Sequence, residues 1–106
     1  MAESKPLIVD LSSVHTADEF HTILAEALGF PVYYGQNWDA FWDIIRNPGG
    51  HCVVLPRKVY FTGWDVLSHR LPREACLFTI CVQDLLEHNV GLCWRRRTVL
   101  DELASI

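Results

Sequence analysis

Residues 32–43 read VYYGQNWDAFWD and place five aromatic side chains and two aspartates within twelve positions. Pro31 and Gly35 favour an irregular backbone at the start of this segment. Asn37 then supplies a side chain of the kind that caps helices, so we expect a helix over about residues 38–46. The sequence NPGG that follows should end it.

The two aspartates of this helix, Asp39 and Asp43, are four residues apart, which places them on one face with Cβ atoms roughly 5–6 Å apart. Trp42 falls on the same side. Trp38, Phe41 and Ile45 form a second stripe, and we expect Phe41 with Ile44 or Ile45 to enter the core. The helix therefore has one apolar face and one acidic, aromatic face.

The acidic face has three interpretations. It is an ordinary solvated surface if Asp39 only interacts with the helix dipole and Arg46 pairs with Asp43. It is a binding surface for a basic partner if the large rings beside the two acids are interface anchors. It is a catalytic or metal site if the carboxylates act together, but the five histidines of the chain show no metal-ligand spacing. We therefore expect no catalytic residue, metal or cofactor.

Apolar runs and helical patterns flank this segment on both sides. Residues 6–11, PLIVDL, predict a buried strand, and Thr16 with Glu19 forms a capping box for a helix that ends at Gly29. The other predicted elements are a strand at 51–56, helices at 64–70 and 73–88, and a strand from about residue 90 into the arginines. Apolar strands separated by helices predict an α/β fold with a small parallel sheet covered by helices.

The composition fits one domain with an acidic surface. A chain of 106 residues suits a single domain, with a core over about residues 6–95 and a C-terminal tail at 98–106. The net charge of -4 disfavours nucleic acid as a partner and favours a basic one. Arg95, Arg96 and Arg97 oppose this balance, and we interpret them as a solvated strand edge.

The cysteines and the N-terminus indicate the compartment. Four cysteines lie in apolar stretches without a C-x-x-C pair, so we expect buried free thiols: Cys52, Cys76, Cys81 and Cys93. The N-terminal sequence MAESKPLIVD has no apolar signal core, and no apolar run approaches the length of a membrane span. These features predict a cytoplasmic protein.

The same central segment carries a resemblance to a known family. The pattern P-x-Y-Y-G-x-N-x-D-A-x-W-D, which begins at Pro31, is similar to the signature of the barstar family, intracellular inhibitors of the ribonuclease barnase. The resemblance implies a three-stranded parallel sheet with packed helices. It also implies that Tyr33, Asp39 and Asp43 contact the enzyme, and that four further residues lie at or beside contact positions: Gly35, Asn37, Trp38 and Trp42.

The resemblance implies a non-enzymatic inhibitor, monomeric when free, that covers the active site of a basic ribonuclease or toxin nuclease. Inhibitors of this family use a further acid on a later helix, for which Asp84 and Glu87 are the candidates here. The alternative is a barstar-like module that binds a partner other than a nuclease, because a fold does not fix a function. Either role involves neither a membrane nor direct nucleic-acid binding.

Overall fold

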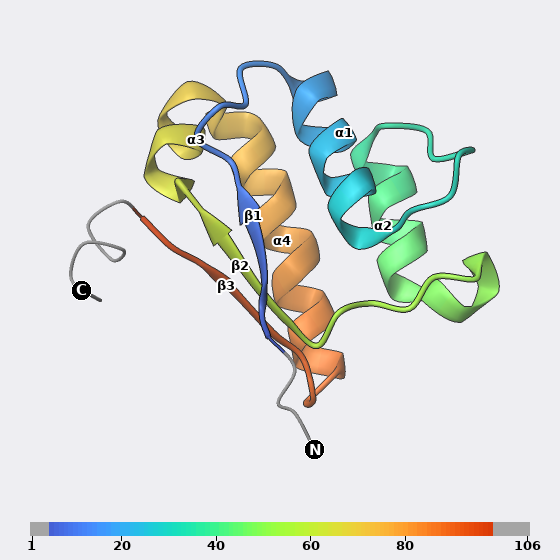
Figure 1. The fold of residues 1–106 in the computed structure, drawn as a ribbon. Helices are drawn as coiled ribbons and strands as arrows, with labels where there is room; N and C mark the ends of the chain where they lie inside the picture. The colour runs from blue at the N-terminus through green and yellow to red at the C-terminus, as the bar shows by residue number, and fades with distance from the viewer. Residues whose placement is uncertain (1–4, 99–106) are drawn as a thin grey trace.

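The computed structural model describes residues 5–98, and the expected tail at 98–106 lies almost entirely outside that range. Three strands, β1 (Leu7–Asp10), β2 (Lys58–Thr62) and β3 (Cys93–Arg96), form one parallel sheet in the order β1-β2-β3 (Figure 1). Val9 pairs with Phe61, and Phe61 pairs with Arg96 across the central strand. The predicted α/β fold with a small three-stranded parallel sheet is confirmed.

Four α-helices and one 3₁₀-helix connect the strands. They are α1 (Ala17–Leu28), α2 (Trp38–Arg46), η1 (Pro48–His51), α3 (Trp64–Arg70) and α4 (Pro72–His88). The predicted caps are present: Thr16 and Glu19 form a capping box, and Gly29 ends α1 in the left-handed conformation with φ 73°. The side chain of Asn37 accepts a hydrogen bond from the Ala40 amide at 2.8 Å and so fixes the start of α2.

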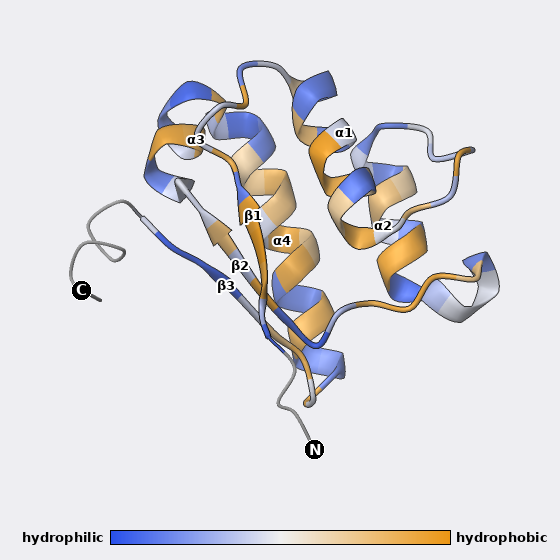
Figure 2. Ribbon diagram, in the orientation of Figure 1, coloured by the Kyte–Doolittle hydropathy of each residue, from blue (hydrophilic) through white to orange (hydrophobic). Residues whose placement is uncertain are grey.

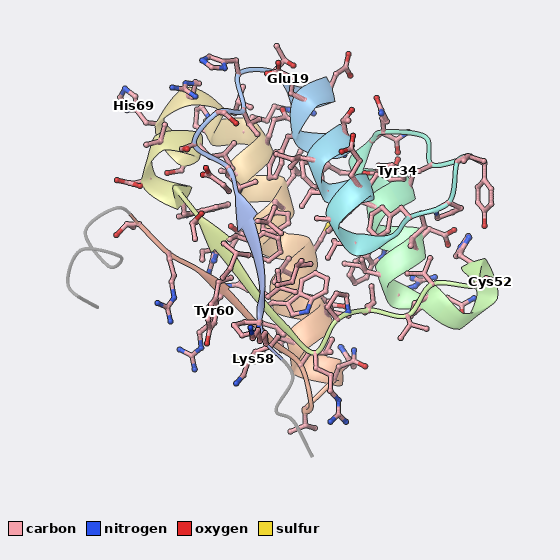
Figure 3. The ribbon with its side chains drawn as sticks, in the orientation of Figure 1. Glu19, Tyr34, Cys52, Lys58, Tyr60 and His69 are labelled. Atoms are coloured by element: carbon pink, nitrogen blue, oxygen red, sulfur yellow. The ribbon has the colours of Figure 1, made fainter. Side chains whose placement is uncertain are left out.

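Within residues 5–98, the helices cover one face of the sheet and leave the other open (Figure 1). The core lies on the covered face and contains buried hydrophobic residues of α1, α2 and α4. Figure 2 shows the hydrophobic residues along these helices. Phe78 of α4 is fully buried at the centre of this core, and its ring lies 5.0 Å from that of Phe61 and 5.8 Å from that of Phe41. On the open face, Ile8 is 55% exposed and Lys58 and Tyr60 point away from the helices (Figure 3).

The predicted strand at residues 51–56 is wrong, because β2 begins at Lys58. The sequence PGGH folds into η1, and Cys52 turns the chain in the left-handed conformation with φ 58°. Of the two valines that follow, Val53 is buried but Val54 is 91% exposed, so the apolar run extends without joining the sheet. The true strand, KVYFT, is richer in the β-branched and aromatic residues that strands prefer.

The cysteine prediction is correct only in part. Cys81 is buried and Cys93 is half-buried, but Cys52 and Cys76 are exposed, and all four are free thiols. Cys76 lies on the outer side of α4, a position that its apolar neighbours in the sequence do not reveal. Within residues 5–98, the helices are too short or too polar to cross a membrane.

Candidate functional site

The outer side of α2 and the loop before it bring together most of the predicted site residues. Phe41, Ile44 and Ile45 are at most 2% exposed and anchor the inner side of the helix in the core. Asp39 and Asp43 are consequently held on the exposed side. The interpretation of α2 as a helix with one apolar and one acidic face is therefore confirmed.

The loop before α2 presents one tyrosine and buries the next. Tyr33 is 64% exposed, whereas Tyr34 is 9% exposed and points inward beside α1 (Figure 3). The Tyr34 hydroxyl is hydrogen-bonded to Nδ1 of His21, which is itself only 2% exposed. Burial lowers the pKa of His21 and raises the pKa of Tyr34 well above its usual range. This neutral buried pair fixes the loop and so determines where Tyr33 lies.

Gly35 lacks a side chain where the Asn37 side chain approaches the loop. The residue with a positive φ in this loop is its neighbour Gln36, at 52°. A Cβ atom on Gly35 would lie 3.2 Å from Nδ2 of Asn37, a tight approach. That nitrogen donates a hydrogen bond to the Gly35 carbonyl at 3.2 Å, while the Asn37 oxygen caps α2. Gly35 and Asn37 therefore shape the start of the helix.

The two tryptophans of α2 occupy different environments. Trp38 lies largely in the core: its ring is 5.3 Å from those of Phe20 and Phe41, and its indole N–H donates to Glu74 Oε1 at 2.7 Å. Trp42 is half-buried between α2 and α4. Both rings are half-buried and pack against the core, and Trp42 differs from Trp38 in lying beside Arg46.

A shallow groove lies between α2 and α4. Its volume is about 310 Å³, and its lining mixes apolar and acidic side chains: Trp38, Asp39, Trp42, Leu77, Ile80, Cys81 and Asp84. Asp84 and Trp42 also line an adjoining groove, which includes Arg46. Glu87 is exposed and lines neither groove. Of the two candidate acids on α4, Asp84 is thus the one beside the α2 site.

A histidine that the sequence patterns did not identify completes the site. His51 Nε2 lies 3.1 Å from Asp43 Oδ2, and its Nδ1 lies 2.9 Å from the Tyr33 hydroxyl. His51 is separated from Tyr33 by 18 residues, a spacing that matches no known motif. The sequence pattern predicts a strand at His51, whereas the structure places it at the end of η1. Only the turn at η1 brings it to the two predicted contact residues.

The pairing of Arg46 with Asp43, which the solvated-surface interpretation allows, is not the arrangement observed. The guanidinium of Arg46 lies over the Trp42 ring, 5.7 Å from its centroid, while Asp43 pairs with His51. Arg46 therefore stacks on one side of α2 and leaves the Asp43 carboxylate facing solvent. Within the described residues, no group of three or more histidine, cysteine, aspartate or glutamate side chains could hold a metal ion.

These features define a small α/β protein with an acidic, aromatic surface built on one helix, the loop before it and the groove beside it. Residues 4–100 match the model of the family described as Barstar (barnase inhibitor). Because the match spans most of the chain, this protein belongs to the barstar family.

Proposed function

We propose that this protein inhibits a basic ribonuclease of the barnase type by covering its active site with α2, the loop at residues 33–37 and the groove beside α4. The observation that carries the proposal is the groove in which Asp39 and Asp84 flank one half-buried tryptophan, Trp42, with Asp43 exposed one turn after Asp39 on α2. A family whose members inhibit barnase supports a ribonuclease as the partner.

The chemistry of the surface suits a ribonuclease active site. Such a site must hold RNA phosphates with cationic and hydrogen-bonding side chains, and carboxylates can occupy the same positions as charge-assisted acceptors. Asp39 and Asp43 supply two carboxylates on one exposed helix face, and Asp84 supplies a third across the groove. The inhibitor would thus imitate the charge of the substrate without being cleaved.

The aromatic residues would provide the apolar part of the contact. Trp42 has the size and position of an interface anchor, since anchors are enriched in tryptophan, tyrosine and arginine. Tyr33 projects from the loop with most of its surface exposed and would contact the same partner. We expect the protein to act in the cytoplasm as a monomer when free, and its exposed Cys52 and Cys76 thiols fit a reducing compartment.

The test is inhibition of barnase-type and other basic ribonucleases by the purified protein and by Asp43→Ala and Asp39→Ala. We expect stoichiometric inhibition, and a loss of at least about 2 kcal/mol of binding free energy for Asp43→Ala, with a smaller loss for Asp39→Ala. Glu26→Ala is the matched control, because it removes the same charge from an exposed position on α1.

The salt dependence of association distinguishes the proposed partner from others. A basic enzyme that meets an acidic surface should bind faster at low ionic strength than at physiological salt. If Asp43→Ala and Asp39→Ala bound the nuclease as tightly as Glu26→Ala, the assignment of the surface would be wrong. Absence of inhibition of every ribonuclease tested would favour a partner that is not a nuclease.

A further inference from the structure

We infer that His51 is a positioning residue of the inhibitory surface: it holds Tyr33 and Asp43 together. The inference rests on the proposed function, because it concerns two residues of the same surface. His51 lies on η1, outside α2 and outside the loop, so it reaches the surface from a third segment of the chain.

The geometry ties both ring nitrogens to the surface. Nε2 lies 3.1 Å from the Asp43 carboxylate and Nδ1 lies 2.9 Å from the Tyr33 hydroxyl. The imidazole is only 19% exposed although Asp43 is 62% exposed, so the ring lies behind the carboxylate that it contacts. The ring centroids of Tyr33 and His51 are 5.9 Å apart, which adds an aromatic contact.

One arrangement of protons satisfies all three groups when His51 is neutral. The carboxylate can only accept, so Nε2–H must donate to Asp43. Nδ1 then accepts from the Tyr33 hydroxyl, which leaves the oxygen of that hydroxyl available to a partner. This arrangement fixes two exposed side chains before binding, and less rotational freedom is then lost in the complex.

No other charged group of the described chain replaces His51 in this position. The titratable groups that contact the imidazole within residues 5–98 are Asp43 from α2 and Tyr33 from the loop before it. Arg46, the cation of α2, stacks on Trp42 instead. His51 is therefore the described side chain that orients the Asp43 carboxylate.

The experiment compares the inhibition constants of wild type, His51→Ala and His51→Gln against a barnase-type ribonuclease at pH 8. At pH 8, His51→Ala should weaken inhibition by between about twofold and tenfold, the effect of freeing one or two ordered side chains. His51→Gln should restore most of the affinity, because one amide also offers a donor and an acceptor.

Rescue by glutamine separates positioning from a general structural role. If the ring only filled space, an amide that keeps the two hydrogen bonds would restore no more affinity than alanine. His69→Gln, which changes an exposed histidine on α3, is the matched control and should leave the inhibition constant of wild type unchanged.

A second readout needs no partner. Nitrogen chemical shifts of the His51 ring in the free protein should show the neutral tautomer protonated at Nε2, and Asp43→Asn should alter them. A ring protonated at Nδ1, or an inhibition constant unchanged in His51→Ala while Asp43→Ala still weakens binding, would overturn the inference and leave the proposed function standing. Failure of wild type to inhibit would instead refute the proposed function and this inference with it.

Discussion

The surface of α2 is acidic and the open face of the sheet is basic. The two surfaces also differ in how far their charged side chains contact the rest of the protein. On the first, Asp39 and Asp84 line a groove, and Asp43 is exposed one turn after Asp39 on α2. On the second, Lys58 and Arg95 project to solvent from neighbouring strands.

The arginines of the sheet are engaged within the protein to a greater degree than the acids of α2. Arg97 stacks 4.2 Å from the centroid of Tyr60. Arg96 lies over the Trp64 ring and donates to the Thr79 hydroxyl at 2.8 Å. Such contacts use the cations to cover rings at the sheet edge. The comparison shows that a net charge of -4 averages two surfaces, and that the acidic one combines charge, rings and a groove.

Of the substitutions that test this comparison, Asp84→Ala on α4 should have the largest effect on inhibition, and Glu87→Ala is its control. Asp84→Ala should weaken inhibition by more than about 1 kcal/mol, because Asp84 lines the groove beside Trp42 and would face the partner. Glu87→Ala removes the same charge one turn away from an exposed position outside the groove, and should change binding by less than about 0.5 kcal/mol. Inhibition constants measured side by side decide the matter, and a reversed order would move the contact surface away from the groove.

The surface of α2 was predictable because local rules determine it. The Asn37 cap, the i to i+4 spacing of the aspartates and the apolar stripe at Phe41 all depend on residues within one or two turns. The groove was not predictable, since Asp84 joins the site only when α4 packs beside α2. The turn at residues 47–57 was mispredicted because its apolar letters resemble a strand, while the backbone at Cys52 is left-handed. His51 lies within this turn, so the mispredicted strand also concealed its approach to Tyr33 and Asp43.

The buried pair His21 and Tyr34, behind the acidic surface, should make the stability of the protein depend on pH. Because the pKa of His21 is lowered by burial, the unfolded chain takes up a proton there more readily than the folded chain. The contribution of His21 to stability is therefore complete above its ordinary pKa of 6.5 and is lost as the pH falls below it. The free energy of unfolding, measured with urea, should decrease from about pH 7 to about pH 5.

A substitution isolates this part of the pH dependence. His21→Gln keeps a hydrogen-bonding partner for Tyr34 but cannot titrate in this range, so its stability should depend less steeply on pH than that of wild type. His88, whose pKa is raised by the Asp84 carbonyl and carboxylate, acts in the opposite direction in both proteins and cancels in the comparison. Equal slopes in the two proteins would mean that the buried ring is not kept neutral by the fold.

The smallest effect should come from the basic face, and it tests the contrast between the two surfaces most directly. Arg95→Glu reverses an exposed charge on the face of the sheet away from α2 and makes the protein more acidic by two units of charge. If α2 is the binding surface, the dissociation rate should stay unchanged and the association rate with a basic nuclease should rise by less than about threefold, an effect that salt removes. Stopped-flow association at two salt concentrations measures both rates. A clear rise in the dissociation rate would place the sheet face, rather than the acidic helix, in contact with the partner.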